Sequence, residues 1–156
     1  MNHKTFWSTF VFLFFNFLAL YLGALFTDAG VNSDWYQNAL KAPWTPPGWM
    51  FGAAWSLIMV CYAFYMAKVW NTISNKNVLI SLYVFQWVLN VLWNPLFFYY
   101  HWVWIAEIVL ILLTILLIYK LIVFSKHAIT AGIFLLPYIF WLLVANSLNL
   151  YFAIKN

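Results

Sequence analysis

The chain has 156 residues, of which 67% are apolar and only 6% are charged. A soluble domain carries roughly 25% charged residues, so this sequence has too little polar material to cover a globular surface in water. The composition excludes an ordinary soluble domain and predicts a protein whose solvent is lipid. The net charge of +4 comes from lysines scattered singly between apolar runs, which gives no basic patch and excludes nucleic acid as a partner.

Five stretches are long and apolar enough to cross a bilayer, which takes roughly 20 such residues in a helix. They are residues 6–26, 47–69, 78–99, 103–124 and 129–154. The connections are short except for the first, residues 27–46, which runs into the pair Pro46-Pro47. Proline is tolerated in the first turn of a helix because the N–H there has no partner. The sequence therefore predicts an all-α membrane protein, with residues 1–156 forming one domain of five transmembrane helices.

The lysines predict the orientation of this bundle. With five helices, the N-terminus and the second and fourth connections lie at one end. That end receives Lys4, Lys68, Lys76, Lys120 and Lys126, and the other receives Lys41 and Lys155. Lysine concentrates on the cytoplasmic side, so we expect a bacterial cytoplasmic membrane with the N-terminus inside; an outer or mitochondrial membrane stays open. Lys120, near the end of its helix, is expected to extend toward the headgroups.

Polar side chains recur on one face of several helices. In residues 78–99, Tyr83, Gln86, Asn90 and Asn94 follow at intervals of three, four and four, which places them on one face. Matching stripes elsewhere are Asn16, Gly23 and Thr27, then Trp49, Gly52 and Trp55, and then Trp141, Ala145 and Asn149. Together they could line one aromatic cavity that carries amides, because polar groups at membrane depth face the interior. The alternative is that the amides only bond helices together.

Other polar residues leave few options for chemistry. Glu107 is the one acidic residue in the membrane segments; it either interacts with the N-terminal dipole of its helix or serves a pocket or a proton relay. No catalytic triad, phosphate loop or metal cluster is visible, so no metal site is predicted. An axial haem ligand from His101 or His127, at predicted helix ends, stays open. Gly48 and Gly52 predict close packing of helices within the chain.

Three blocks of residues resemble the TspO/MBR family, the tryptophan-rich sensory and translocator proteins. The first is Trp35-Tyr36, then residues 40–49 (LKAPWTPPGW), Gly52 and Trp55. The second is Leu82-Tyr83, Gln86, Leu89-Asn90, Trp93, Pro95 and Phe97-Phe98, and the third is Pro137-Tyr138, Trp141, Ala145 and Leu148-Asn149. The blocks stand in the order of the family and cover nearly the whole chain.

The resemblance implies a five-helix bundle in which the first long loop lids a pocket for protoporphyrin IX or haem, with no required cofactor. The predicted ligand-binding residues, from the resemblance and the polar stripes, are Trp35, Pro43, Trp44, Gly52, Trp55, Gln86, Asn90, Trp93, Trp141, Ala145 and Leu148. Family members are often homodimers. Some bind cholesterol, but the sterol-recognition stretch here, Leu148, Tyr151 and Lys155, has lysine in place of arginine and is a weak pattern.

Three functions stay open from the sequence. The first is a membrane receptor or translocator that binds tetrapyrroles in the pocket. The second, implied by the resemblance alone, is an enzyme that degrades porphyrin in light and oxygen, with Trp55 and Trp141 flanking the ring as electron donors. The third is a small proton-coupled exporter, for which Glu107 would be the coupling carboxylate.

Overall fold

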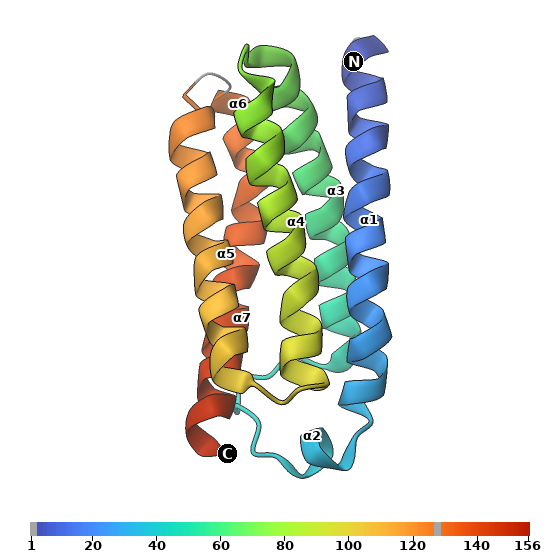
Figure 1. The fold of residues 1–156 in the computed structure, drawn as a ribbon, viewed down its shortest axis with the longest axis vertical. Coiled ribbons are helices and arrows are strands. Elements are labelled where there is room, and N and C mark those ends of the chain that lie inside the picture. Colours follow the sequence, from blue (N-terminus) through green and yellow to red (C-terminus); the bar gives the residue numbers. More distant parts are fainter. Residues whose placement is uncertain (1–2, 127–128) are drawn as a thin grey trace.

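The structure, a computed structural model, describes residues 3–126 and 129–156, and over these ranges it is built from helices and their connections, with no strand (Figure 1). The long helices are α1 (His3–Val31), α3 (Gly48–Thr72), α4 (Lys76–Phe98), α5 (Val103–Phe124) and α7 (Leu136–Lys155). Within these described ranges, five spans are long and apolar enough to cross a membrane. The predicted all-α architecture with five such helices is confirmed.

The five long helices run side by side (Figure 1), and their contacts close them into a ring. Helix α1 packs against α3 and α4, α4 packs against α5, α5 packs against α7, and α7 returns to α3. The N-terminus lies at one end with the α3–α4 connection, called here the N-terminal end. The short helix α2 (Asp34–Asn38), the α4–α5 turn and the C-terminus lie at the other, called the loop end.

The distribution of side chains fits a bundle surrounded by lipid. Large apolar residues point outward, among them Phe14, Ile115 and Phe140, each more than half exposed. The interior holds packed aliphatic and aromatic groups such as Leu117 and Leu142, both fully buried. A soluble bundle would place its polar residues outside, so the outward apolar surface agrees with lipid as the solvent.

Two elements differ from the prediction. Helix α1 continues through Asp28 to Val31, and the loop that follows contains α2, where the Ser33 hydroxyl accepts from the Tyr36 N–H at the helix start. The fifth predicted helix is interrupted: α6 (Ile129–Gly132) and the 3-10 turn η1 (Ile133–Leu135) come before α7. Pro137, in the first turn of α7, has no N–H to bond the preceding turn, which explains the break.

The expected close packing at Gly48 and Gly52 is wrong, because a Cβ built at either would meet no atom within 4 Å. The close approach occurs between α1 and α4 instead. A Cβ on Gly23 would lie 2.6 Å from Nδ2 of Asn94, and one on Gly30 would overlap the Phe98 side chain. Glycine is therefore needed where α1 meets α4, while the start of α3 borders open space.

Candidate ligand cavity

A cavity of about 610 Å³ lies inside the bundle toward the loop end. Helices α1, α3, α4 and α7 and the first loop supply its walls, with Leu110 from α5. Of the predicted ligand-binding residues, those that line it are Gly52, Trp55, Asn90, Trp93, Trp141, Ala145 and Leu148. Those outside the lining are Trp35, Pro43, Trp44 and Gln86. Whether the lining residues bind a ligand stays a prediction.

Three tryptophans form the aromatic part of the wall, and each is oriented by a neighbouring ring. Trp55 packs edge-on against Tyr138, with ring centroids 5.7 Å apart. Trp141 meets Phe51 edge-on at 5.5 Å, and Trp93 stacks on Phe97 at 5.4 Å. Offset and edge-to-face pairs of this kind are favourable and hold the rings in place, so the cavity presents fixed indole surfaces.

The amides of α4 divide between the cavity and the packing of helices. Gln86 and Asn90 both donate to the Tyr138 hydroxyl, Gln86 at 3.0 Å, but only Asn90 also lines the cavity. Asn94 lines it too, and its side-chain oxygen accepts from the Thr27 hydroxyl at 2.7 Å. Gln86 therefore only joins helices, whereas Asn90 and Asn94 both join helices and line the cavity.

Tyr83 and Asn16 belong to the structural part of this polar set. The Tyr83 hydroxyl donates to Oδ1 of Asn16 at 2.8 Å, and the Asn16 amide donates to the Met59 carbonyl at 2.9 Å. Both side chains are buried and neither lines the cavity. They join α1, α3 and α4, as hydrogen bonds between membrane helices commonly do.

Glu107 lies inside the bundle, with only 5% of its surface exposed. The Asn149 amide donates to Oε2 of Glu107 at 2.9 Å and to the Val103 carbonyl at 3.1 Å. Because both partners are acceptors, they fix the orientation of the amide. Asn149 lines the cavity and Glu107 does not, so the carboxylate supports the wall from behind.

The first loop covers the mouth of the cavity. Tyr36, Lys41 and Thr45 contribute to the lining there. The Lys41 ammonium lies 4.7 Å from the centre of the Tyr36 ring, a distance typical of a cation–π contact. Burial raises the pKa of the Tyr36 hydroxyl above its ordinary value, so it remains a neutral phenol at physiological pH.

Trp44 lies outside the cavity and fastens this loop to α7. Its indole N–H donates to the Ser147 hydroxyl at 3.2 Å, and its ring packs edge-on against Tyr151 at 5.4 Å. The neighbouring Pro43 is exposed. Neither residue belongs to the lining, and their part in closing the pocket, which the resemblance implies, stays a prediction.

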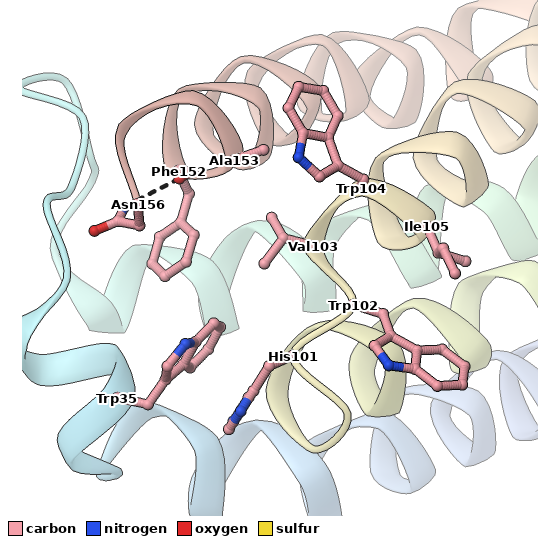
Figure 2. A pocket seen from close by; sticks show the side chains of 9 residues that line it. All are labelled: Trp35, His101, Trp102, Val103, Trp104, Ile105, Phe152, Ala153 and Asn156. Atoms are coloured by element: carbon pink, nitrogen blue, oxygen red, sulfur yellow. Dashed lines mark hydrogen bonds between the residues drawn. The ribbon is translucent and has the colours of Figure 1, made fainter.

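A second pocket of about 400 Å³ lies at the loop end, next to the α4–α5 turn (Figure 2). Trp35 and His101 line it and stack at 4.0 Å, while Phe152 lines both this pocket and the cavity. Trp35 is thus separated from the cavity by Phe152, whose ring is 5.0 Å away. His101 has φ of 57°, in the left-handed region that a non-glycine residue rarely adopts.

Histidine ligation of haem gains no support from the described residues. His101 faces Trp35 outside the cavity, and His127 lies outside the described residues. Over the described ranges, no three His, Cys, Asp or Glu side chains gather in a way that could hold a metal ion.

Some lining residues were not predicted. Tyr36 and Phe97 stand within the motif blocks, but nothing in the blocks separates lining residues from packing residues. Phe51 directly precedes Gly52 and stands one turn before Trp55 on α3, so the helical period could have found it. Phe152 is one turn beyond Leu148 on α7, so the helical period could have found it.

Lys120 does not extend toward the headgroups as expected; it is fully buried. Its amine hydrogen-bonds the Tyr62 hydroxyl and lies 3.5 Å from Sδ of Met66, and its backbone carbonyl accepts from the Tyr65 hydroxyl at 3.0 Å. The aromatic groups of α3 hold the side chain inside the bundle, which a position near a helix end could not reveal.

These features define a class: an integral membrane protein whose five-helix bundle encloses an aromatic cavity under a loop. The chain belongs to the TspO/MBR family, whose model matches residues 10–154. Protein CrtK of Rhodobacter capsulatus is 30% identical over 131 residues, covering 81% of this chain and 79% of the relative. Tryptophan-rich protein TspO of Archaeoglobus fulgidus is 33% identical over 137 residues, covering 87% of this chain and 88% of the relative. Translocator protein of Bos taurus is 29% identical over 133 residues, covering 83% of this chain and 78% of the relative.

Proposed function

We propose that this protein is a membrane receptor or translocator whose cavity binds a tetrapyrrole such as protoporphyrin IX or haem. The observation that carries the proposal is the cavity of about 610 Å³ walled by Trp55, Trp93 and Trp141. Its volume lies within the roughly 300–1,000 Å³ range of small-molecule sites, which are mostly apolar with a few polar groups. Flat indole faces suit a flat, largely apolar macrocycle.

The polar groups of the cavity would orient such a ligand. Asn90, Asn94 and Thr27 lie together on the wall between α1 and α4, and Lys41 and Asp28 lie near the mouth. A tetrapyrrole carries carboxylates on one edge of an apolar ring. With that edge toward Lys41, its charge would stay close to water while the ring enters the bundle.

A titration with protoporphyrin IX in the dark tests the proposal. The detergent-solubilised protein is followed by porphyrin absorbance and by tryptophan fluorescence, beside the Trp55→Phe/Trp141→Phe variant. A matched control, Trp7→Phe/Trp104→Phe, removes two exposed tryptophans outside the cavity. We expect saturable binding that weakens only in the cavity variant. Absence of saturable binding, or equal weakening in both variants, would contradict the proposal.

We also propose that the N-terminal end faces the cytoplasm of a bacterial cell. Four lysines outside the core lie there, namely Lys4, Lys68, Lys76 and Lys126, against Lys41 and Lys155 at the loop end. Labelling from outside the cell of single cysteines placed at Lys126 and at Leu40, in a Cys61→Ala background, tests this. We expect only the Leu40 position to react with an impermeant maleimide.

A further inference from the structure

Lys120 of α5 and Tyr62 of α3 form a fully buried pair that the cavity does not use. A hydrogen bond joins the Lys120 amine to the Tyr62 hydroxyl. The amine also lies 4.9 Å from the centre of the Tyr62 ring and 5.9 Å from that of Tyr83. The pair therefore sits in a tyrosine-lined part of the core, on the side of the cavity toward the N-terminal end.

No counter-ion is in reach of this amine. The chain has three acidic residues, all of them described. Asp28 and Asp34 belong to the loop end. Glu107 stands thirteen positions before Lys120 on α5, which is about 20 Å along the helix axis. Burying an ammonium without a counter-ion costs more than burying the neutral amine, so the neutral amine is the form that fits this site, and it can accept a proton.

A series of aromatic rings connects this pair with the cavity. Tyr62 meets Tyr138 edge-on with centroids 5.5 Å apart, and Tyr138 meets Trp55 edge-on at 5.7 Å. Trp55 lines the cavity, while Tyr62 and Tyr138 are fully buried. Rings in such contact exchange an electron readily, and tyrosine can reduce an oxidised indole provided that its phenolic proton has an acceptor.

We propose that Tyr62 is a redox-active tyrosine and that Lys120 is its proton acceptor. The inference rests on the proposed function for its oxidant, a photo-excited tetrapyrrole in the cavity. The excited ligand takes one electron from Trp55 and becomes its radical anion. Tyr62 then returns an electron to Trp55 through the Tyr138 ring, and its O–H bond breaks as the proton passes to Nζ of Lys120. The products are a neutral Tyr62 phenoxyl radical, a Lys120 ammonium and a restored indole.

Return of the electron from the ligand radical anion to the phenoxyl, with return of the proton from Lys120, resets the pair. The sequence of steps conserves one electron and one proton. Its result is that the oxidising equivalent moves from Trp55, on the cavity wall, to Tyr62, which has no exposed surface. Proton transfer of this kind requires the two heavy atoms to be in hydrogen-bond contact, and Tyr62 and Lys120 meet that requirement.

The test uses electron paramagnetic resonance of the full chain in detergent. In the first arm, ligand-free protein is frozen and irradiated with ultraviolet light that ionises indoles. In the second arm, protoporphyrin-loaded protein receives visible light. Ring-deuterated tyrosine identifies tyrosyl signals. We expect a tyrosyl radical in both arms that falls to background in Tyr62→Phe and is replaced by tryptophan radicals in Lys120→Met. Tyr99→Phe, which removes an exposed tyrosine at the loop end, leaves it unchanged.

A tyrosyl signal as large in Tyr62→Phe or Lys120→Met as in the unsubstituted protein would overturn the inference. If a variant does not fold, electron–nuclear double resonance on the unsubstituted protein decides, because the phenoxyl oxygen must show an exchangeable hydrogen bond from the protonated amine. A signal with ultraviolet light but none with loaded porphyrin would support the Tyr62–Lys120 pair and count against the proposed ligand. Absence of the tyrosyl radical under ultraviolet light rejects the pair itself.

Discussion

The side chain of Asn156 pairs with the backbone of Leu40 through two hydrogen bonds. Its amide oxygen accepts from the Leu40 N–H at 2.8 Å, and its Nδ2 donates to the Leu40 carbonyl at 3.1 Å. Asn156 thus holds the loop that covers the cavity. Together with Trp44 on Ser147, it fastens the loop to α7 at two points.

The two hydrogen bonds between Asn156 and Leu40 form a clamp on the loop, and removing this clamp should make the loop open more often. In Asn156→Ala, two hydrogen bonds near solvent are lost, which we expect to cost about 1 kcal/mol and to raise the open population roughly fivefold. Hydrogen exchange at the Leu40 amide measures the opening. Asn156→Asp keeps the acceptor for the Leu40 N–H and is expected to retain part of the protection. Equal exchange in all three proteins would mean that the clamp does not limit opening.

Gly23 and Gly52 should respond oppositely to alanine. A Cβ on Gly23 would lie 2.6 Å from Nδ2 of Asn94, so Gly23→Ala is expected to destabilise the bundle by about 1–3 kcal/mol through overpacking between α1 and α4. Gly52 has open space, so Gly52→Ala should leave stability unchanged or raise it by up to about 1 kcal/mol through helix propensity. Thermal unfolding in one detergent compares the two variants. A loss in Gly52→Ala as large as in Gly23→Ala would refute the assignment of open space.

Hydropathy was sufficient to predict the five long helices, because each needs only its own apolar run. It could not predict α2, since a five-residue helix with the Ser33 cap has too few positions for a period to emerge. It also could not predict the break before α7, although Pro137 marks the place. The observed end of α1 also differs from the predicted one. The helix continues past Asp28, beyond the apolar run on which the prediction was based.

The side chains of the site were harder to place, because their surroundings come from other helices. Gln86 and Asn90 share one face of α4. Gln86 nevertheless only bonds Tyr138, whereas Asn90, one helical turn later, lines the cavity. Trp35 was expected in the lining and is shielded by Phe152 of α7. Lys120 was expected at the headgroups because of its position near a helix end; its burial depends on Tyr62 and Tyr65 of α3, which the spacing on α5 cannot reveal.

The Asn16–Tyr83 bond should show coupling in a double-mutant cycle. Asn16→Leu leaves the Tyr83 hydroxyl buried without an acceptor, so it should destabilise the protein more than Tyr83→Phe does. In Asn16→Leu/Tyr83→Phe both polar groups are gone, and we expect a coupling energy of about 0.6–1.7 kcal/mol, as for hydrogen bonds between membrane helices. Denaturant unfolding in mixed micelles measures the cycle. Simple additivity would show that the bond contributes no coupling.

Glu107 should affect the stability of the cavity wall and not proton-coupled transport. Glu107→Gln keeps an oxygen that can accept from Asn149, so ligand affinity and stability should change little, whereas Glu107→Leu removes that acceptor and should loosen the cavity wall. Protoporphyrin titration and thermal unfolding compare the two variants. If instead Glu107→Gln abolished proton-driven uptake of a ligand in vesicles, the exporter function would gain the support that it now lacks.

Lys120 offers a test of whether the buried pair is retained for stability. Lys120→Met alone leaves the Tyr62 hydroxyl without its partner, and Tyr62→Phe alone leaves the amine without one, so each should lose stability or gain little. Replacing both partners of a buried hydrogen bond by apolar groups of similar shape can be nearly neutral or stabilising. We therefore expect Lys120→Met/Tyr62→Phe to unfold at a temperature at least as high as that of the unsubstituted protein. A lower temperature would mean that the pair contributes net stability, and its presence in the core would then need no redox explanation.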